Sequence, residues 1–144
     1  MAKFRICVLC AVLVVPVLLL ACAPAAKAEA PVTVNCEQFS KQANIVRDVN
    51  TVTGNKIVVT LCSNPTTGFQ WAEKAQIGNP QVLEQKSYNF IAPTNTGMVG
   101  APGNCVWTFE AMQPGISVIN LEYSRPWEGG EKAVQTFKLN VTVK

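Results

Sequence analysis

Hydrophobic and polar residues alternate along most of the chain beyond residue 44. The alternation is clearest in four stretches, residues 56–61, 106–111, 119–123 and 137–143. In the last of these, Phe137 and Leu139 fall on one side of an extended backbone and Lys138 falls on the other. Strict alternation with β-branched and aromatic residues is typical of strands that bury one face. Each stretch is therefore predicted to be a half-buried antiparallel strand.

Three weaker patterns, at residues 45–52, 69–76 and 82–91, bring the expected number of strands to about seven in roughly 100 residues. No apolar stripe with helical spacing continues for ten residues or more. This number and spacing of strands predict an all-β fold. We expect an immunoglobulin-like antiparallel β-sandwich of about seven strands rather than a closed barrel.

The first 22 residues have a different pattern. Lys3 and Arg5 precede an apolar run over residues 6–21, and Cys22 follows it. This is the order of an export signal. The run of about 16 residues is short for a membrane-spanning helix, which needs about 20.

Two cleavage sites are compatible with this signal. The sequence LLAC at residues 19–22 resembles the lipobox of bacterial lipoproteins, in which Cys22 becomes the acylated first residue. The sequence AKA at residues 26–28 fits an ordinary signal peptidase, and cleavage after residue 28 would release a soluble secreted protein. We favour the lipobox, because a cysteine seldom falls at that position by chance.

The expected organisation is a signal peptide at residues 1–21, a tether at residues 22–43 and the sandwich domain at residues 44–144. The protein is expected to be exported, either as a cell-envelope lipoprotein or as a periplasmic or secreted protein. It would then contact a membrane only through its lipid anchor.

Charge and composition exclude several classes of function. The chain has 12 basic and 9 acidic residues, and removing residues 1–21 leaves 10 basic residues and a net charge of +1. These charges are scattered, so no basic stripe is available for nucleic acid. The absence of histidine removes Ser-His and Cys-His nucleophile pairs and imidazole zinc ligands. The acidic residues show no catalytic spacing, and there is no phosphate-binding loop. We expect no enzyme activity, no cofactor and no metal site.

The exported part of the chain beyond Cys22 keeps Cys36, Cys62 and Cys105. Three pairings are open, and each leaves one thiol unpaired. Cys62 ends one predicted strand and Cys105 begins another, so a disulfide between them is expected and Cys36 would be the free thiol. The alternation argues against this pairing, since Cys62 has the opposite parity to the inward-facing Leu61 while Cys105 shares the parity of Trp107. A slip of register near a loop would reconcile the two.

Three distinctive loops separate the predicted strands, at residues 64–68, 92–103 and 124–131. The first reads NPTTG, the second is rich in Gly and Pro, and the third places Trp127 beside a proline. Pro65 fixes its own φ and Gly68 can adopt a positive φ, so the first loop is expected to be rigid. Because all three loops leave even-numbered strands, they are expected to emerge at the same end of the sandwich.

Each of these loops also has a purely structural interpretation. Asn64 can hold its turn through hydrogen bonds to the backbone, and Gly97 and Gly100 can serve loop geometry alone. Arg125 can pair with an acidic residue of its own loop, and Trp127 can fold back over a sheet edge. Composition does not decide between these interpretations and contact with a partner.

The motifs NPTTG, GMVG and RPW, together with the flanking WTFEA and LEYS, resemble the chagasin-type inhibitors of papain-like cysteine peptidases. The resemblance covers residues 45–144 and includes all three family motifs in order. It implies an immunoglobulin-like sandwich whose three loops form a wedge in the active-site cleft of the peptidase. The long second loop, the lipobox and the extra cysteines depart from the family pattern.

The resemblance implies that the central loop inserts beside the catalytic cysteine, with the second and third loops on either side. The peptidase-binding residues would be Asn64, Pro65, Thr66, Thr67, Gly68, Gly97, Met98, Val99, Gly100, Arg125, Pro126 and Trp127. The expected partner is a papain-like peptidase of cathepsin-L-like or related type, bound reversibly and tightly by a monomer. The alternative is a non-inhibitory cell-envelope binding or assembly module with the same fold.

Overall fold

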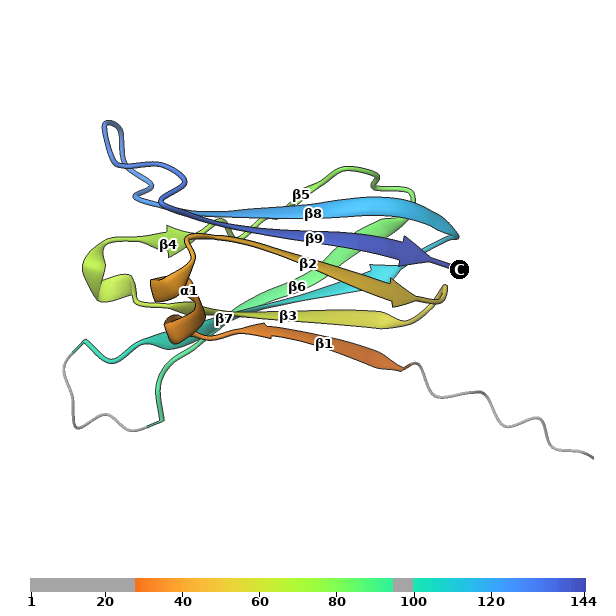
Figure 1. Cartoon of the computed structure of the whole chain (residues 1–144), viewed down its shortest axis with the longest axis horizontal. Coiled ribbons are helices and arrows are strands. Elements are labelled where there is room, and N and C mark those ends of the chain that lie inside the picture. Colours follow the sequence, from red (N-terminus) through yellow and green to blue (C-terminus); the bar gives the residue numbers. More distant parts are fainter. Residues whose placement is uncertain (1–27, 95–99) are drawn as a thin grey trace, which may run out of the picture.

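Two β-sheets pack face to face in the computed structural model, which describes residues 28–94 and 100–144 (Figure 1). The elements are β1 (Glu29–Val34), α1 (Cys36–Lys41), β2 (Asn44–Thr51), β3 (Lys56–Ser63), the 3-10 turn η1 (Pro65–Thr67), β4 (Gln70–Trp71), β5 (Gln76–Ile77), β6 (Leu83–Ile91), β7 (Gly103–Ala111), β8 (Gly115–Ser124) and β9 (Gln135–Val143). The predicted all-β sandwich is confirmed, with one short helix added to it.

One sheet has the strand order β1-β3-β7-β6, and the other has the order β2-β9-β8-β4, with β5 also pairing with β8. Most neighbouring strands are antiparallel, as expected, but β1 runs parallel to β3 and β2 runs parallel to β9. Neither parallel pair is joined by a hairpin, because β1 reaches β3 through α1 and β2 of the other sheet, and β2 reaches β9 only through strands β3 to β8. Parallel neighbours need such a crossover, whereas hairpins join antiparallel ones.

The predicted boundary at residue 44 is wrong, because residues 29–43 belong to the sandwich. Strand β1 pairs with β3 along its whole length, and its last residue, Val34, is completely buried. Asn35 caps α1 through a reciprocal pair of hydrogen bonds with Gln38, and Phe39 packs against Trp71 with the ring centroids 5.2 Å apart. The expected tether can therefore extend no further than residue 28. The predicted signal peptide and Cys22 lie within residues 1–27, which are outside the described residues, and both predicted cleavage sites lie at or before residue 28.

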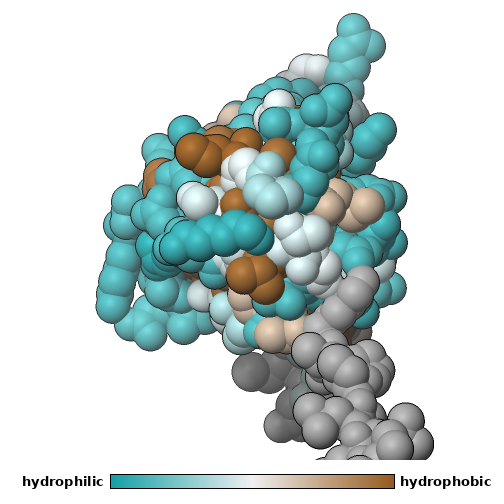
Figure 2. Space-filling model, turned by 90° about the vertical axis from the view of Figure 1, so that its right-hand side faces the viewer, coloured by the Kyte–Doolittle hydropathy of each residue, from teal (hydrophilic) through white to brown (hydrophobic). Residues whose placement is uncertain are grey.

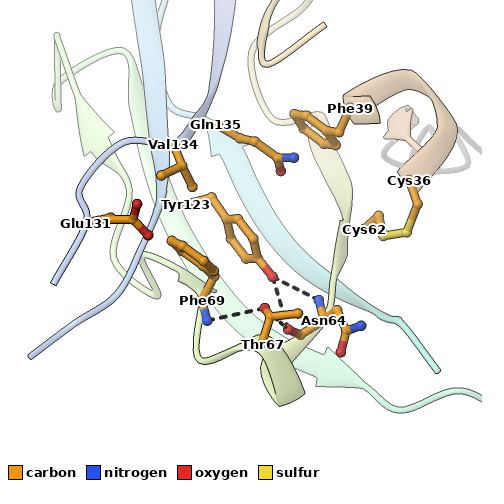
Figure 3. Close-up of a pocket in the computed structure, with 10 residues that line it drawn as sticks. All are labelled: Cys36, Phe39, Cys62, Asn64, Thr67, Phe69, Tyr123, Glu131, Val134 and Gln135. Carbon is orange, nitrogen blue, oxygen red and sulfur yellow. Dashed lines mark hydrogen bonds between the residues drawn. A yellow bond between two sulfur atoms is a disulfide. The ribbon is translucent and has the colours of Figure 1, made fainter. Parts of the chain in front are cut away.

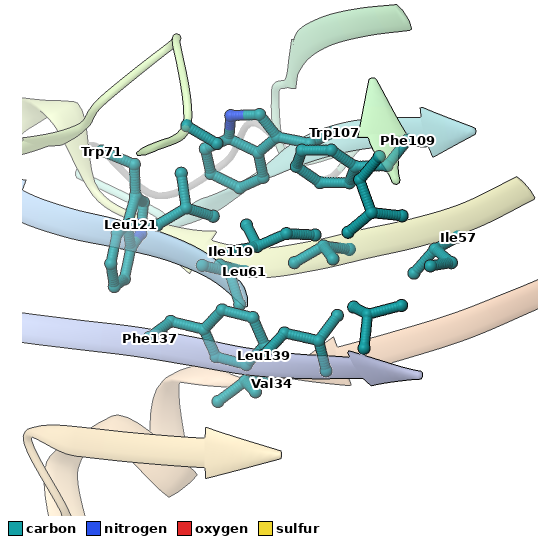
Figure 4. Packing of buried hydrophobic residues seen from close by; sticks show 14 of the residues in the cluster. Val34, Ile57, Leu61, Trp71, Trp107, Phe109, Ile119, Leu121, Phe137 and Leu139 are labelled. Carbon is teal, nitrogen blue, oxygen red and sulfur yellow. The ribbon is translucent and has the colours of Figure 1, made fainter. Parts of the chain in front are cut away.

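The core lies between the two sheets and is built from the inward positions of the alternating strands (Figure 4). Residues such as Leu61, Trp107, Phe109, Phe137 and Leu139 are completely buried. Burying each large apolar side chain contributes about 1.5–3 kcal/mol to folding. The alternation seen in the sequence is thus confirmed, and the core makes a rigid base for the loops at the ends of the strands.

The predicted disulfide between Cys62 and Cys105 is wrong. Cys36 and Cys62 form the disulfide, with their Cα atoms 5.2 Å apart, and Cys105 is a buried free thiol. The register of β3 and β7 pairs Cys105 with Leu61, and both side chains face the core. Cys62 follows Leu61 and so has the opposite orientation, on the side to which α1 brings Cys36. The register between β3 and β7 has no slip, and the alternation by itself indicates that Cys62 and Cys105 face opposite sides of the sheet.

The Cys105 thiol lies 3.4 Å from the hydroxyl of Tyr88. Burial, followed by this contact, raises the pKa of Tyr88, so its hydroxyl stays protonated at neutral pH.

Within residues 28–94 and 100–144, no helix is both long and apolar enough to cross a membrane.

Candidate functional site

The three distinctive loops leave the sandwich at the same end, on the left in Figure 1. The first connects β3 to β4, the second connects β6 to β7, and the third connects β8 to β9. Strand register brings their bases together, since Ser63 pairs with Gly103 and Gln70 pairs with Ser124. The predicted shared edge is confirmed for the described parts of the loops. Gly97, Met98 and Val99 lie outside the described residues.

The first loop is a single 3-10 turn held by its own side chains. Asn64 Oδ1 accepts hydrogen bonds from the backbone N–H of Thr66 at 3.2 Å and from the Thr66 hydroxyl at 2.6 Å. The Thr67 hydroxyl donates to the Asn64 carbonyl at 2.7 Å. Gly68 ends the turn at φ 80°, a value that favours glycine. The exposed tip, residues 65–67, therefore carries small side chains on a fixed backbone.

A core tyrosine fixes the start of this loop (Figure 3). The Tyr123 hydroxyl accepts from the Asn64 backbone N–H at 2.9 Å and donates to the Asn64 carbonyl at 3.3 Å. The Tyr123 ring is buried, and it packs against Trp71 with the centroids 5.0 Å apart. Since Trp71 Nε1 also donates to the Cys62 carbonyl at 2.9 Å, the end of β3 is held from two sides.

Asn64 also joins the first loop to the second. Its Nδ2 donates to the carbonyl of Gly100 at 2.9 Å. Gly100 has φ 84° and thus serves loop geometry, as the structural interpretation expected. Both polar atoms of the Asn64 side chain are engaged within the protein. Asn64 therefore positions the loops, and the exposed residues beside it are left for a partner.

The third loop folds against the first. A Cβ atom at Gly68 would lie only 2.8 Å from Cη2 of Trp127, so the indole ring occupies the space that a side chain would need. The Arg125 guanidinium lies 4.4 Å from the centroid of the Phe69 ring, and its Nη1 pairs with Glu131 at 3.0 Å. The expected pairing of Arg125 within its own loop is thus found, with Glu131 as the partner. Stacking of a guanidinium on an aromatic face adds about 0.5–1 kcal/mol at such an exposed site.

Backbone contacts close the third loop on itself. The Arg125 N–H donates to the Glu131 carbonyl at 2.8 Å, and Lys132 Nζ donates to the carbonyls of Arg125 and Trp127. The loop is therefore preorganised even though it stands away from the sheets. Nothing in the sequence distinguished Lys132, because its two partners are brought to it only by the folded loop.

Apolar surface gathers at this end of the molecule. Trp127 keeps 51% of its surface exposed, so it does not fold back over a sheet edge. Phe90, Ile91 and Val134 are also large exposed hydrophobic residues, and they flank the second and third loops. Pro126 is exposed beside them. Exposed aromatic residues at a rigid edge are typical of binding surfaces. No group of three or more residues that could hold a metal ion occurs in the described ranges.

Comparison with known proteins identifies relatives that match much of the sandwich domain. The family model described as chagasin family peptidase inhibitor I42 matches residues 50–141. Amoebiasin-2 from Entamoeba histolytica is 31% identical over 90 residues, which cover 61% of this chain and 70% of that protein. Chagasin from Trypanosoma cruzi is 32% identical over 77 residues, covering 53% of this chain and 70% of that protein.

The fold is also shared with a solved structure. The crystal structure of a cysteine protease inhibitor from Entamoeba histolytica superposes with a TM-score of 0.62 at 22% sequence identity. The match covers 83% of this chain and 98% of that one. It extends beyond the segment that the family model matches, and it shows the same sandwich fold.

Proposed function

This chain belongs to the chagasin family of peptidase inhibitors, and we propose that it inhibits papain-like cysteine peptidases by inserting its loop end into their active-site cleft. It is an inhibitor and not an enzyme. The observation that supports this target and this mode is the first loop, which presents two small threonines on a backbone fixed by Asn64 and Tyr123. The structural relative from Entamoeba histolytica is a cysteine protease inhibitor, which supports the class of the target.

The geometry of the first loop suits occlusion without cleavage. A substrate is cut when its carbonyl reaches the attacking sulfur in an extended, aligned geometry. Residues 65–67 form a 3-10 turn instead, and the hydrogen bonds of Thr66 and Thr67 oppose its extension into a strand. A loop that is fixed before binding also loses less conformational entropy on docking, which strengthens affinity. Small side chains at the tip suit a narrow cleft.

The other two loops would contact the peptidase on either side of the cleft. Trp127 is the anchor that we assign to the third loop, because its ring is half exposed and packs against the backbone of Gly68. Pro126 lies next to it and would share the contact. Arg125 is engaged by Phe69 and Glu131, and its guanidinium lies 5.8 Å from the centroid of the Trp127 ring, so we assign it the role of holding Trp127 in place. In the second loop, residues 97–100 are assigned to the opposite rim.

Titration of residues 23–144 against papain and a cathepsin-L-like peptidase tests this proposal. Reversible, tight inhibition by the intact chain is expected, and mass spectrometry should find the inhibitor uncut. Thr66→Arg should weaken inhibition strongly because the larger side chain does not fit the cleft, and Trp127→Ala should weaken it by about 2 kcal/mol. If the folded wild-type protein inhibits neither enzyme, the alternative role as an envelope binding module takes over.

We also propose that the protein is exported and anchored through an acylated Cys22. The apolar run before Cys22 supports this, and so does the disulfide between Cys36 and Cys62, since such bonds persist in oxidising compartments. The described chain starts beside Lys56, at the end of the sandwich opposite the loops. Figure 2 views that end, where hydrophilic side chains surround scattered hydrophobic ones. Mass analysis of the mature N-terminus would distinguish acylation at Cys22 from cleavage after residue 28.

A further inference from the structure

An open cavity of about 450 Å³ lies beside the first loop, between α1 and the third loop (Figure 3). Its walls are mostly apolar and comprise the Cys36–Cys62 disulfide, Phe39, Phe69, Tyr123 and Val134. Five separate parts of the chain contribute these residues: α1, the end of β3, the end of β8, and the segments that follow the first and third loops. This volume falls within the range of small-ligand sites in proteins, so the cavity has room for one large side chain.

The cavity is continuous with the peptidase-binding loop. Asn64 and Thr67 line it, and both residues also form the 3-10 turn that we place in the cleft. A protein that closes around this turn must therefore pass over the mouth of the cavity. Because the cavity lies on the side of the turn next to α1, the part of the partner that reaches it would be the rim of the cleft.

Polar atoms around the cavity are already engaged within the inhibitor. The Tyr123 hydroxyl is bonded to Asn64, the Thr67 hydroxyl donates to the Asn64 carbonyl, and Glu131 pairs with Arg125. Gln135 is the remaining polar residue of the lining. What the cavity offers to a partner is therefore mostly apolar surface, and its one charged residue, Glu131, is already paired with Arg125. This favours an aliphatic or aromatic occupant over a charged one.

Helix α1 supplies one wall of the cavity, and it precedes the segment at residues 50–141 that the family model matches. Phe39 is fixed there by its contact with Trp71, and Cys36 is fixed by its disulfide. The wall is thus rigid, although it lies outside the segment that carries the three family motifs. It is a place where this inhibitor can differ from others that share those motifs.

We propose that this cavity binds an apolar side chain that projects from the rim of the target's cleft, and that it selects among papain-like peptidases. The proposal rests on the proposed function and adds to it a subsite on the inhibitor. Peptidases with an aliphatic or aromatic residue at that point of the rim gain a buried contact. Those with a charged residue there lose hydration without gaining a partner.

Val134→Trp tests the proposal by filling the cavity from its edge, where Val134 is 38% exposed. The matched control is Ile116→Trp, which adds the same ring to a residue 70% exposed on β8 at the opposite end of the sandwich. Val134→Ala is a second variant, which removes apolar wall without adding bulk. Inhibition constants are measured against a panel of papain-like peptidases, with thermal unfolding to confirm that each variant is folded.

The expected result is that Val134→Trp raises the inhibition constant about tenfold for some peptidases of the panel and leaves others unchanged. Val134→Ala should raise it a few-fold for the same peptidases, and Ile116→Trp should change none. Equal inhibition of every peptidase by Val134→Trp and wild type would overturn the subsite while leaving the proposed function intact. A wild-type protein that inhibits no member of the panel would instead refute the proposed function itself.

Discussion

The hydroxyl of Tyr123 binds both backbone polar groups of Asn64, accepting from its N–H at 2.9 Å and donating to its carbonyl at 3.3 Å. These residues are 59 positions apart in the sequence. Tyr123 is itself clamped in the core by Trp71 and Phe69. The start of the wedge loop is thereby joined to the most rigid part of the molecule, and the position of the loop depends on a side chain that is buried in the core.

Tyr123→Phe should therefore weaken inhibition while keeping the aromatic packing. The change leaves the Asn64 N–H without its partner, which should lower the free energy of unfolding by about 1–2 kcal/mol. The loop then samples more conformations before binding, so the inhibition constant against papain should rise about three- to tenfold. Thermal unfolding and enzyme titration of the same sample measure both effects.

Tyr88→Phe is the matched control for this change. The Tyr88 hydroxyl, like that of Tyr123, contacts a polar group of the protein, in this case the Cys105 thiol. Tyr88 lies on β6, however, and not at the first loop. We expect a change in stability of similar or smaller size and an unchanged inhibition constant. If both variants weaken inhibition equally, general destabilisation explains the loss and Tyr123 does not position the loop.

Gly68→Ala should displace the indole of Trp127. Gly68 has φ 80°, and its added methyl group would lie 2.8 Å from Cη2 of Trp127. The backbone cost of such a φ is about 1–2 kcal/mol for an L-residue. Displacement of the anchor should add a loss of about tenfold in affinity, seen as faster dissociation in surface plasmon resonance.

Gly129→Ala separates these two effects. Gly129 has a similar φ of 73°, but a Cβ atom there would have no heavy atom within 4 Å. It should therefore carry only the backbone cost, with little change in affinity. An equal loss of affinity in both variants would show that backbone strain, and not the position of Trp127, controls binding.

Much of the fold was predictable from the sequence because it depends on short-range alternation. The inward positions of β3, β7, β8 and β9 follow directly from a period of two. Strand β1 was missed because its run of six residues contains Pro31 and follows an Ala- and Pro-rich segment. Proline is tolerated there, since β1 is an edge strand. Its pairing with β3 is a long-range contact that no local pattern reveals.

The loops of the candidate site were also predictable, since Pro65 and Gly68 carry their geometry in their own residue types. What could not be predicted is how the loops support one another. The bond from Asn64 to Gly100 and the contact of Gly68 with Trp127 join segments that only the sheets bring together. The disulfide is a different case: the alternation indicates that Cys62 faces outward, whereas the proximity of strand ends favours Cys105, which is the wrong partner.

Cys36→Ser should destabilise the protein, since the disulfide closes a loop with a sequence separation of 26. Chain-entropy arguments assign about 3.5 kcal/mol to a loop of this length. Reduction of the wild-type protein should lower its melting temperature as much as the Cys36→Ser substitution does. Peptide mapping without reduction should find Cys36 linked to Cys62, with Cys105 resistant to alkylation until the protein unfolds, because it is only 1% exposed. A linked Cys62–Cys105 peptide would contradict the structure.

Attachment of the protein to a surface through its N-terminus should leave inhibition intact. Glu29 pairs with Lys56 at the start of β3, and Asn64 follows the end of that strand. Eight residues of strand separate the two ends by about 26 Å, so a peptidase on the loops would not meet the surface. The control is attachment through Gly129→Cys, in the third loop, which can be labelled selectively because the Cys105 thiol is buried. Papain activity is measured above both surfaces at equal inhibitor density. The N-terminal surface should inhibit as the free protein does and the Gly129→Cys surface should not; the reverse result would place the binding surface at the other end of the sandwich.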